Sequence, residues 1–199
     1  MLVKTCGIMT KEAADTAVQA GADFIGFVFA PSKRYLTPEQ AADIASIVPS
    51  SVKKIGVFVN ETAETITSIA EKVGLDYVQL HGDETAEFAE QLPYRVIKAF
   101  PATQESFAKL KDYPCDYYLI DSPFGANRGG NGTAFDWTVL KELNLDSNKL
   151  FLAGGLTSEN VQQAIRLTEP IGVDVSSGIE TDGSKDLSKI KNFILNAKG

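Results

Sequence analysis

The sequence has few of the residues that build several common kinds of site. Its 199 residues include 2 cysteines and 1 histidine, with no Cys-x-x-Cys pair and no cluster of carboxylates at the expected strand ends. Two cysteines do not make a disulfide framework, and such a set of side chains disfavours a metal site. No dinucleotide fingerprint follows the first strand. We therefore expect chemistry without a metal or a cofactor.

Basic charge is also scarce, since 19 basic residues stand against 26 acidic ones and give a net charge of −7. A polyanionic partner such as nucleic acid or an acidic membrane surface is therefore not expected. No apolar run approaches the ~18 residues that a membrane span requires, and Met1–Lys4 opens a strand-like segment rather than a signal peptide. These observations predict a reduced, cytoplasmic protein.

What the sequence does contain is a repeated alternation of strand-like and helix-like segments. Eight short runs rich in β-branched and aromatic residues are Leu2–Thr5, Phe24–Phe29, Lys54–Val59, Tyr77–Leu80, Val96–Phe100, Tyr117–Asp121, Leu150–Ala153 and Gly172–Val175. The helix-like segments that follow them are Lys11–Ala20, Pro38–Val48, Ala63–Val73, Glu84–Leu92, Gln104–Leu110, Trp137–Leu143, Ser158–Leu167 and Leu187–Asn196. Eight such units predict an α/β fold, a single-domain (β/α)8 barrel over residues 1–199. An open flavodoxin-like sheet is the alternative, but it normally has about five strands.

The predicted helices carry matching signals at their ends. Thr37–Gln40 supplies a capping hydroxyl, a proline at the first helical position and a glutamine that can reach back to the cap. Gly21 and Gly74 follow helices with apolar periodicity, where a left-handed cap residue is expected. The end signals therefore agree with the division into eight units.

In such a barrel the functional site lies at the carboxyl ends of the strands. Cys6 follows the first strand and Asp121 closes the sixth, so the two face each other across the barrel mouth. A thiolate can accept a proton, and a carboxyl group in a poorly solvated mouth can stay protonated as an acid. The alternatives are a buried packing cysteine and a carboxylate that accepts hydrogen bonds from loop N–H groups.

Other polar residues near the strand ends are candidates for binding substrate. Arg34 offers a planar fork suited to a carboxylate, although it could be a solvated loop charge. Gln79 and His81 end the fourth strand, and His81 could orient a substrate or simply satisfy its own loop. Lys98 lies late in the fifth strand, where a lysine is unfavourable unless it is paired or near the wet mouth. We therefore expect Lys98 to line the site.

Glycine-rich or serine-rich loops follow the last three strands. They contain Gly130 and Gly132 after the sixth strand, Gly154 and Gly155 after the seventh, and Ser176 and Ser177 after the eighth. Glycine lets backbone N–H groups approach an anion closely, and a helix N-terminus adds a favourable dipole. Plain turn chemistry is the alternative for any single loop. Three such loops in consecutive units predict that the protein binds a small phosphorylated molecule.

Motifs along the whole chain resemble the phosphoribosylanthranilate isomerase family. They are Lys4–Gly7, Gly26–Phe29, Ser32–Tyr35, Gly56–Asn60, Val78–Gly82, Leu119–Asp121, Gly129–Gly132, Phe135–Trp137, Ala153–Leu156 and Asp174–Glu180. Two departures are Thr5, where Ile is usual, and Arg128 before the glycine loop. Neither departure removes a catalytic group that the family would require.

The resemblance implies a (β/α)8 enzyme of tryptophan biosynthesis. Such enzymes convert N-(5-phosphoribosyl)anthranilate to 1-(o-carboxyphenylamino)-1-deoxyribulose 5-phosphate, an Amadori rearrangement. It also implies that Cys6 is the general base, that Asp121 is the general acid and that Arg34 holds the anthranilate carboxylate. The phosphate would fall to backbone groups of the glycine and serine loops. We expect a monomer or a homodimer.

Two other functions fit part of the pattern. Another phosphate-binding barrel, such as indole-3-glycerol-phosphate synthase, would be expected to have a longer N-terminal extension and catalytic lysines at the strand ends. A barrel that senses a sugar phosphate without turnover would not need the pair formed by Cys6 and Asp121. A turnover assay that follows anthranilate-type fluorescence separates the sensor from the enzyme.

Overall fold

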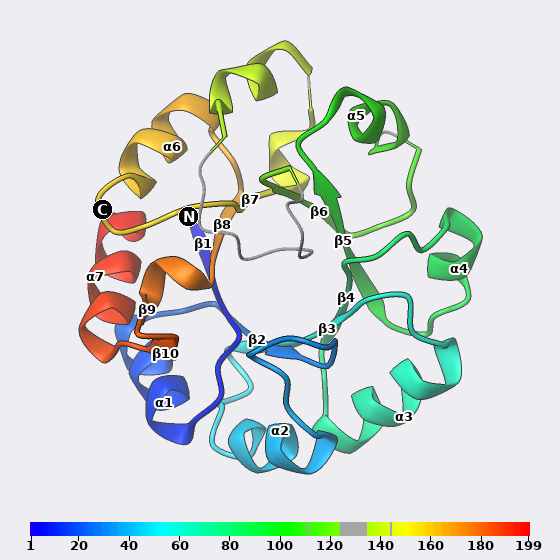
Figure 1. Ribbon diagram of the computed structural model, residues 1–199, viewed down its shortest axis with the longest axis vertical. Helices are drawn as coiled ribbons and strands as arrows, with labels where there is room; N and C mark the ends of the chain where they lie inside the picture. The colour runs from blue at the N-terminus through cyan, green and yellow to red at the C-terminus, as the bar shows by residue number, and fades with distance from the viewer. Residues whose placement is uncertain (111, 124–134, 144) are drawn as a thin grey trace.

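The computed structural model describes residues 1–110, 112–123, 135–143 and 145–199, which form a closed barrel of parallel strands joined in chain order. The strands form the inner ring in Figure 1 and the helices the outer one. The barrel strands are β1 (Leu2–Cys6), β2 (Phe24–Val28), β3 (Lys53–Phe58), β4 (Tyr77–Leu80), β5 (Arg95–Pro101), β6 (Tyr117–Asp121), β7 (Leu150–Leu152) and β8 (Gly172–Val175). Strand β8 pairs with β1 and closes the ring, with Lys4 opposite Asp174. The predicted fold class is confirmed.

α-Helices cover the outside of the barrel. They are α1 (Lys11–Ala20), α2 (Pro38–Ala45), α3 (Ala63–Val73), α4 (Ala86–Glu90), α5 (Gln104–Leu110), α6 (Val161–Thr168) and α7 (Leu187–Lys198). The predicted capping box at Thr37 is present. Gly21 and Gly74 end α1 and α3 in the left-handed conformation, with φ of 96° and 69°. No helix within the described ranges is long and apolar enough to cross a membrane.

The two helices predicted on either side of β7 differ from the observed ones. The segment Trp137–Leu143 is a 3₁₀ helix, η1, rather than an α-helix. Helix α6 begins three residues later than the predicted start at Ser158. The side chain of Asn160 accounts for the delay, because its Nδ2 donates to the carbonyl of Gly155 and its Oδ1 accepts from the N–H of Thr157. This pairing holds a turn before the helix.

The chain after β8 forms structure that the apolar pattern did not predict. A short 3₁₀ helix, η3 (Ser177–Ile179), leads into a hairpin of β9 (Glu180–Thr181) and β10 (Ser184–Lys185), and α7 follows. The strands of the hairpin are two residues long. Short polar strands of this kind have no hydrophobic periodicity to detect.

The barrel interior has an apolar floor. The rings of Phe24 and Tyr77 meet edge to face at 5.8 Å between centroids, and those of Phe24 and Phe151 at 5.5 Å. Ile55, Ile97 and other apolar side chains complete this cluster. Side chains alternate between the two faces of a strand. Residues two positions farther along each strand therefore also point inward, nearer the mouth.

Candidate active site

Polar side chains face the interior at the mouth of the barrel. Leu2 packs against the floor, so alternation along β1 turns Lys4 and Cys6 inward as well. Leu119 belongs to the floor, and Asp121 lies two residues beyond it on β6. The structure thus confirms that Cys6 and Asp121 lie at the carboxyl ends of their strands, with side chains that point into the barrel.

Cys6 is a buried free thiol at the end of β1. A Cβ on Gly26 of the neighbouring strand would lie 2.9 Å from the Cys6 Sγ, so a glycine there leaves room for the sulfur. The hydroxyl of Ser176 donates to the Cys6 carbonyl at 3.1 Å and ties β1 to the loop after β8. Cys115, which precedes β6, is also a free thiol, as predicted.

A buried ion pair lies one step below Cys6 on the inward face. The Nζ of Lys4 is 3.0 Å from the Oδ1 of Asp174, and the two side chains are 0% and 10% exposed. Burial disfavours the ammonium, but Asp174 and Cys6 together raise the pKa of Lys4 above its ordinary value. The sequence reasoning assigned neither residue of the pair a role. A signal for the pair was available in the sequence, because each of these two mostly apolar strands carries one charged residue, at a position that faces the interior.

Asp121 is buried at the end of β6, and its environment favours the protonated acid. Burial first, and then the negative charge of Asp174, raise the pKa of Asp121 to about 6. Its Oδ1 accepts a hydrogen bond of 2.8 Å from the N–H of Ser122. A Cβ on Gly154 would lie 2.4 Å from that nitrogen, so the close approach of the two loops requires glycine, here at φ 83°.

The Lys4–Asp174 pair acts differently on the two candidate groups. Burial raises the pKa of the Cys6 thiol, and among the charges nearby the lowering effect of Lys4 exceeds the raising effect of Asp174. On Asp121 the raising effect of Asp174 exceeds the lowering effect of Lys4. The pair therefore opposes part of the effect of burial on Cys6, whose pKa stays above its ordinary value, and adds to the effect of burial on Asp121. Proton transfer in both directions requires a base and an acid, and Cys6 and Asp121 are the candidates for these two roles.

His81 lies beside Asp121, and Gln79 contacts His81. The Nε2 of His81 is 3.6 Å from the Oδ2 of Asp121, and the Nδ1 of His81 is 2.9 Å from the Nε2 of Gln79. The Oε1 of Gln79 is buried and has no hydrogen-bond partner among the residues that the structure describes. The structure therefore brings His81 to the candidate acid, and Gln79 fixes the orientation of the imidazole.

Arg34 also reaches the mouth, but its guanidinium is held by a carboxylate that the sequence reasoning did not single out. Its Nε and Nη2 donate to the two oxygens of Glu180 at 2.6 and 3.0 Å. Lys33 and Lys185 contact the same carboxylate at 3.0 and 2.9 Å. Burial opposes ionisation of Glu180, yet Arg34 and Lys185 lower its pKa to about 2. Glu180 and Lys185 belong to the hairpin that was not predicted.

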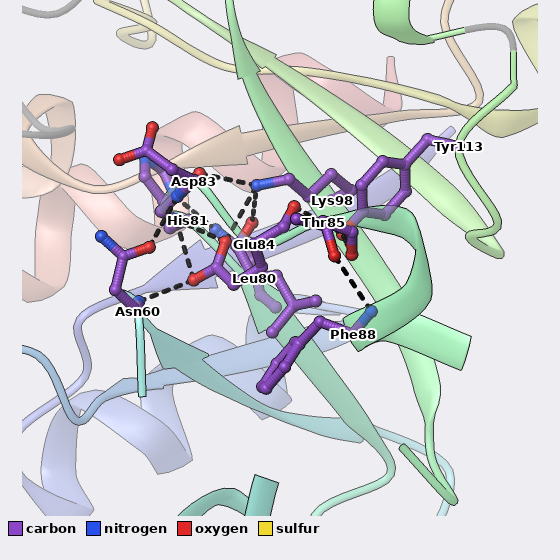
Figure 2. Close-up of polar contacts among 11 residues, drawn as sticks. Asn60, Leu80, His81, Asp83, Glu84, Thr85, Phe88, Lys98 and Tyr113 are labelled. Atoms are coloured by element: carbon purple, nitrogen blue, oxygen red, sulfur yellow. Dashed lines mark hydrogen bonds and ion pairs between the residues drawn. The ribbon is translucent and has the colours of Figure 1, made fainter. Parts of the chain in front are cut away.

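The prediction that Lys98 lines the site is wrong. On β5, Ile97 and Ala99 belong to the interior floor, so Lys98 between them points to the outer face. Its Nζ lies 2.9 Å from the Oε2 of Glu84 and donates to the carbonyl of Gly82 at 2.7 Å (Figure 2). The lysine is buried, as expected, but its partner is a loop carboxylate outside the barrel.

The loops after β7 and β8 meet at the mouth. Gly154 and Gly155 both have positive φ, 83° and 64°. A Cβ on Gly178 would lie 1.9 Å from the Leu156 carbonyl oxygen, so the two loops are in close contact. Gly130 and Gly132, predicted for the same role, lie outside the described residues.

Two cavities border these loops. The larger, about 380 Å³, is lined by Gly155, Leu156, Thr157, Ser158, Glu159, Ser177, Gly178 and Lys189. The smaller, about 30 Å³, is lined by Asp121, Ala153, Gly154, Gly155, Leu156, Asp174, Val175, Ser176 and Ser177. The predicted anion loops and the candidate acid thus border one space. In the part of the chain that the structure describes, no three His, Cys, Asp or Glu side chains are grouped as a metal ion would need.

Comparisons with known proteins agree along the whole chain. The family model described as N-(5'phosphoribosyl)anthranilate (PRA) isomerase matches residues 3–196. A protein of Oceanobacillus iheyensis named N-(5'-phosphoribosyl)anthranilate isomerase is 51% identical over 199 residues, which cover 100% of this chain and 97% of the relative. A protein of Listeria monocytogenes with the same name is 49% identical over 200 residues, which cover 100% of this chain and 99% of the relative.

Solved structures show the same similarity. The crystal structure of phosphoribosyl anthranilate isomerase from Thermotoga maritima superposes with a TM-score of 0.90 at 40% identity, covering 100% of this chain and 99% of the other. Another similar structure is a complex of the isomerase with reduced 1-(o-carboxyphenylamino)-1-deoxyribulose 5-phosphate, with a TM-score of 0.87 at 40% identity. That match covers 100% of this chain and 98% of the other.

Proposed function

We propose that this chain, which belongs to the N-(5'-phosphoribosyl)anthranilate isomerase family of tryptophan biosynthesis, catalyses the family's Amadori rearrangement by general acid–base chemistry without a cofactor. The observation that carries the proposal is that the carboxyl group of Asp121, with a pKa of about 6, and the buried thiol of Cys6 lie at the same mouth of the barrel. Both side chains point into the barrel from the carboxyl ends of their strands.

Asp121 acts first in the proposed reaction. It donates its proton to the furanose ring oxygen, the bond from that oxygen to C1′ breaks, and a protonated Schiff base forms between C1′ and the anthranilate nitrogen. A carboxyl group with a pKa of about 6 keeps a protonated fraction near neutral pH. An ordinary aspartate, with a pKa of about 3.9, would be almost fully ionised there.

Cys6 acts second. Its thiolate takes the proton from C2′, and the electron pair of that C–H bond moves toward the Schiff base to give an enolamine. Loss of the proton on the C2′ hydroxyl and protonation of C1′ then give the ketone. Lys4 supports the thiolate, because its charge lowers the pKa of Cys6 against the effect of burial.

Two further subsites hold the substrate in the proposal. Arg34 takes the carboxylate of the anthranilate, for which a guanidinium fork is suited. Backbone groups around Gly154, Gly155, Ser176 and Ser177 take the phosphate, supported by their position around the cavities next to Asp121. The net charge of −7 is no obstacle, because local N–H dipoles meet the phosphate.

We also propose that the protein works in the cytoplasm on a small phosphorylated substrate, with neither nucleic acid nor membrane as a partner. A monomer or a homodimer is consistent with this proposal. One similar crystal structure is described as monomers generated from a dimeric isomerase of Thermotoga maritima.

A fluorescence assay tests the function. N-(5-phosphoribosyl)anthranilate is generated in the cuvette, and the decrease in its fluorescence on addition of the protein reports turnover. Cys6→Ser should lower kcat by about 10²-fold or more, because a hydroxyl is a much poorer base at neutral pH. Cys115→Ser is the matched control, since it changes the other free thiol and should keep wild-type kcat. Absence of turnover by the folded wild-type protein would overturn the proposal.

A further inference from the structure

Glu180 occupies an unusual position at the barrel mouth, because three cations share its carboxylate. Its Oε1 accepts from Arg34 and Lys185, and its Oε2 contacts Arg34 and Lys33. The Glu180 side chain is 6% exposed. Three positive charges and one negative charge leave this cluster with a net charge of +2, so it still attracts a further anion.

The way in which Glu180 binds Arg34 leaves one edge of the guanidinium open. The two hydrogen bonds use the Nε–H and one N–H of Nη2, at 2.6 and 3.0 Å. A guanidinium has five N–H donors. The two of Nη1 and the second of Nη2 remain, and they form the edge that can take another carboxylate with two parallel bonds. No described residue accepts a hydrogen bond from Nη1 of Arg34.

The stem of Arg34 is also held in place. A Cβ on Gly7, the residue after Cys6, would lie 2.5 Å from the Cδ of Arg34, so the stem crosses the backbone at the end of β1. The N–H of Arg34 donates to the hydroxyl of Ser32 at 3.0 Å. The guanidinium therefore lies between Glu180 and the strand end that carries Cys6.

Glu180 is itself fixed from the opposite side. It begins the β9–β10 hairpin, and Lys185 on the second strand of the hairpin donates to its Oε1 at 2.9 Å. Lys185 also donates to the carbonyl of Ser176 at 2.8 Å, in the loop after β8. The hairpin thus connects Arg34 to the loop assigned to the phosphate.

We propose that Glu180 is a positioning residue that sets the preference of this site for a substrate with an aromatic carboxylate, by holding Arg34 so that its open edge faces that group. The inference rests on the proposed function, in which Arg34 binds the carboxylate of the anthranilate. The opposing possibility is that Glu180 blocks Arg34 and must be displaced by the substrate. Removal of the Glu180 charge should weaken binding of the carboxylated ligand if Glu180 positions Arg34, and should tighten it if Glu180 blocks Arg34.

The test compares two ligands that differ by one carboxylate. The first is reduced 1-(o-carboxyphenylamino)-1-deoxyribulose 5-phosphate, and the second is its analogue with an unsubstituted phenylamino group. Calorimetry gives the ratio of their Kd values for each variant. Glu180→Gln should reduce the preference for the carboxylated ligand by about 10-fold, the loss expected when a charge-assisted hydrogen bond is misaligned. Its Kd for the unsubstituted ligand should stay within about 2-fold. A tighter Kd for the carboxylated ligand would show displacement and overturn the inference.

Two controls use the same cluster. Lys33→Ala removes a cation from Glu180 but leaves the Arg34 pair, and its ligand preference should match that of the wild type. Arg34→Met should abolish the preference, and adding Glu180→Gln in that background should change nothing further. An equal effect of Glu180→Gln with and without Arg34 would overturn the positioning role, because Glu180 would then act by another route.

A second variant covers the case in which Glu180→Gln fails to fold. Glu180→Asp keeps the charge but shortens the side chain, so it should weaken the preference for the carboxylated ligand in the same calorimetric comparison. Unchanged preference in Glu180→Asp would overturn the inference. If the wild type itself shows no preference, or Arg34→Met retains one, the carboxylate role of Arg34 in the proposed function fails. A wild-type preference that depends on Arg34 but not on Glu180 defeats only the inference.

Discussion

Two buried lysine–carboxylate pairs with nearly equal N···O distances lie on opposite sides of the barrel sheet, one outside the barrel and one inside it. The Lys98–Glu84 pair, at 2.9 Å, lies on the outer face, and the Lys4–Asp174 pair, at 3.0 Å, lies inside the barrel. Lys98 also donates to the Gly82 carbonyl, and Glu84 accepts from the N–H groups of Asn60 and Gly82 at 2.7 and 2.9 Å (Figure 2). The outer pair is therefore part of a hydrogen-bonded loop network.

Among the described residues the inner pair has fewer such bonds, and its charges act on the two candidate reacting groups. Burial raises the pKa of Cys6 and the charge of Lys4 opposes that rise, whereas burial raises the pKa of Asp121 and the charge of Asp174 adds to that rise. A buried ion pair contributes to stability only when additional hydrogen bonds satisfy its remaining donors and acceptors. The comparison predicts that the outer pair stabilises the loop after β4, whereas the inner pair contributes to the proposed chemistry.

The largest effect is expected where the inner pair acts on the acid. Asp121→Asn removes the transferable proton but retains an oxygen for the N–H of Ser122. Loss of a general acid typically lowers the rate by about 10²–10⁴-fold, and KM should change little because Arg34 and the loops remain. Steady-state kinetics measures both constants. A kcat near that of the wild type would transfer the acid role elsewhere, with His81 the next residue to test.

The same variant has an opposite effect on stability. The folded-state pKa of Asp121, about 6, lies above its unfolded value, so its stabilising contribution is complete below about pH 4 and is lost as the pH rises through 6. About two pKa units correspond to about 3 kcal/mol. Asp121→Asn should therefore be more stable than the wild type at pH 8, with little gain at pH 4. Urea denaturation at the two pH values measures the difference. A variant that is less stable at pH 8 would contradict the assigned pKa.

Replacement of the outer pair should lower the free energy of unfolding but leave activity nearly unchanged. Lys98→Met leaves the buried carboxylate of Glu84 uncompensated, and removal of one partner of a buried pair costs about 3–5 kcal/mol. The double variant Lys98→Met/Glu84→Met should stay destabilised, because the N–H groups of Asn60 and Gly82 lose their acceptor. Urea denaturation gives the free energy, and kcat/KM of the folded protein should stay within about 3-fold. Recovery of wild-type stability in the double variant would show that the network contributes nothing beyond the pair.

Replacement of the inner pair should lower activity but leave stability nearly unchanged. The expected loss of activity is the smallest of the predicted effects. The matched double variant Lys4→Met/Asp174→Leu leaves no buried charge behind, and such replacements are often neutral or stabilising. Its free energy of unfolding should stay within about 2 kcal/mol of the wild-type value. Its kcat/KM should fall by about 10-fold for each unit by which the pKa values of Cys6 and Asp121 move. Wild-type kcat/KM in this variant would end the functional distinction between the two pairs.

The sequence predicted the strands and the positions of both candidate reacting groups because these depend on local patterns. The apolar runs located Cys6 and Asp121 at strand ends, and the capping signal at Thr37 is present in the structure. The prediction for Lys98 was wrong because side chains alternate along a strand, and the preceding residue, Ile97, faces the interior. Alternation from that residue would have placed the lysine outside the barrel.

The contacts of Arg34 could not be predicted in this way. Its partner Glu180 is 146 residues away in sequence and lies on a hairpin too short to carry a periodic pattern. The Lys4–Asp174 pair spans 170 residues and depends on the register with which β8 joins β1. Such pairings follow from closure of the barrel, and no local property of the chain encodes them.

That closure also determines when the site can exist during synthesis of the chain. Lys4 and Cys6 lie on the first strand of the barrel to be synthesised, whereas Asp174 and Ser176 come from the last barrel strand and the loop after it. At about 5–20 residues per second, a separation of 170 residues corresponds to roughly 9–34 s of translation. During this interval the lysine that later supports the thiolate has no buried partner. A nascent chain therefore carries the proposed base long before the last barrel strand completes the candidate site.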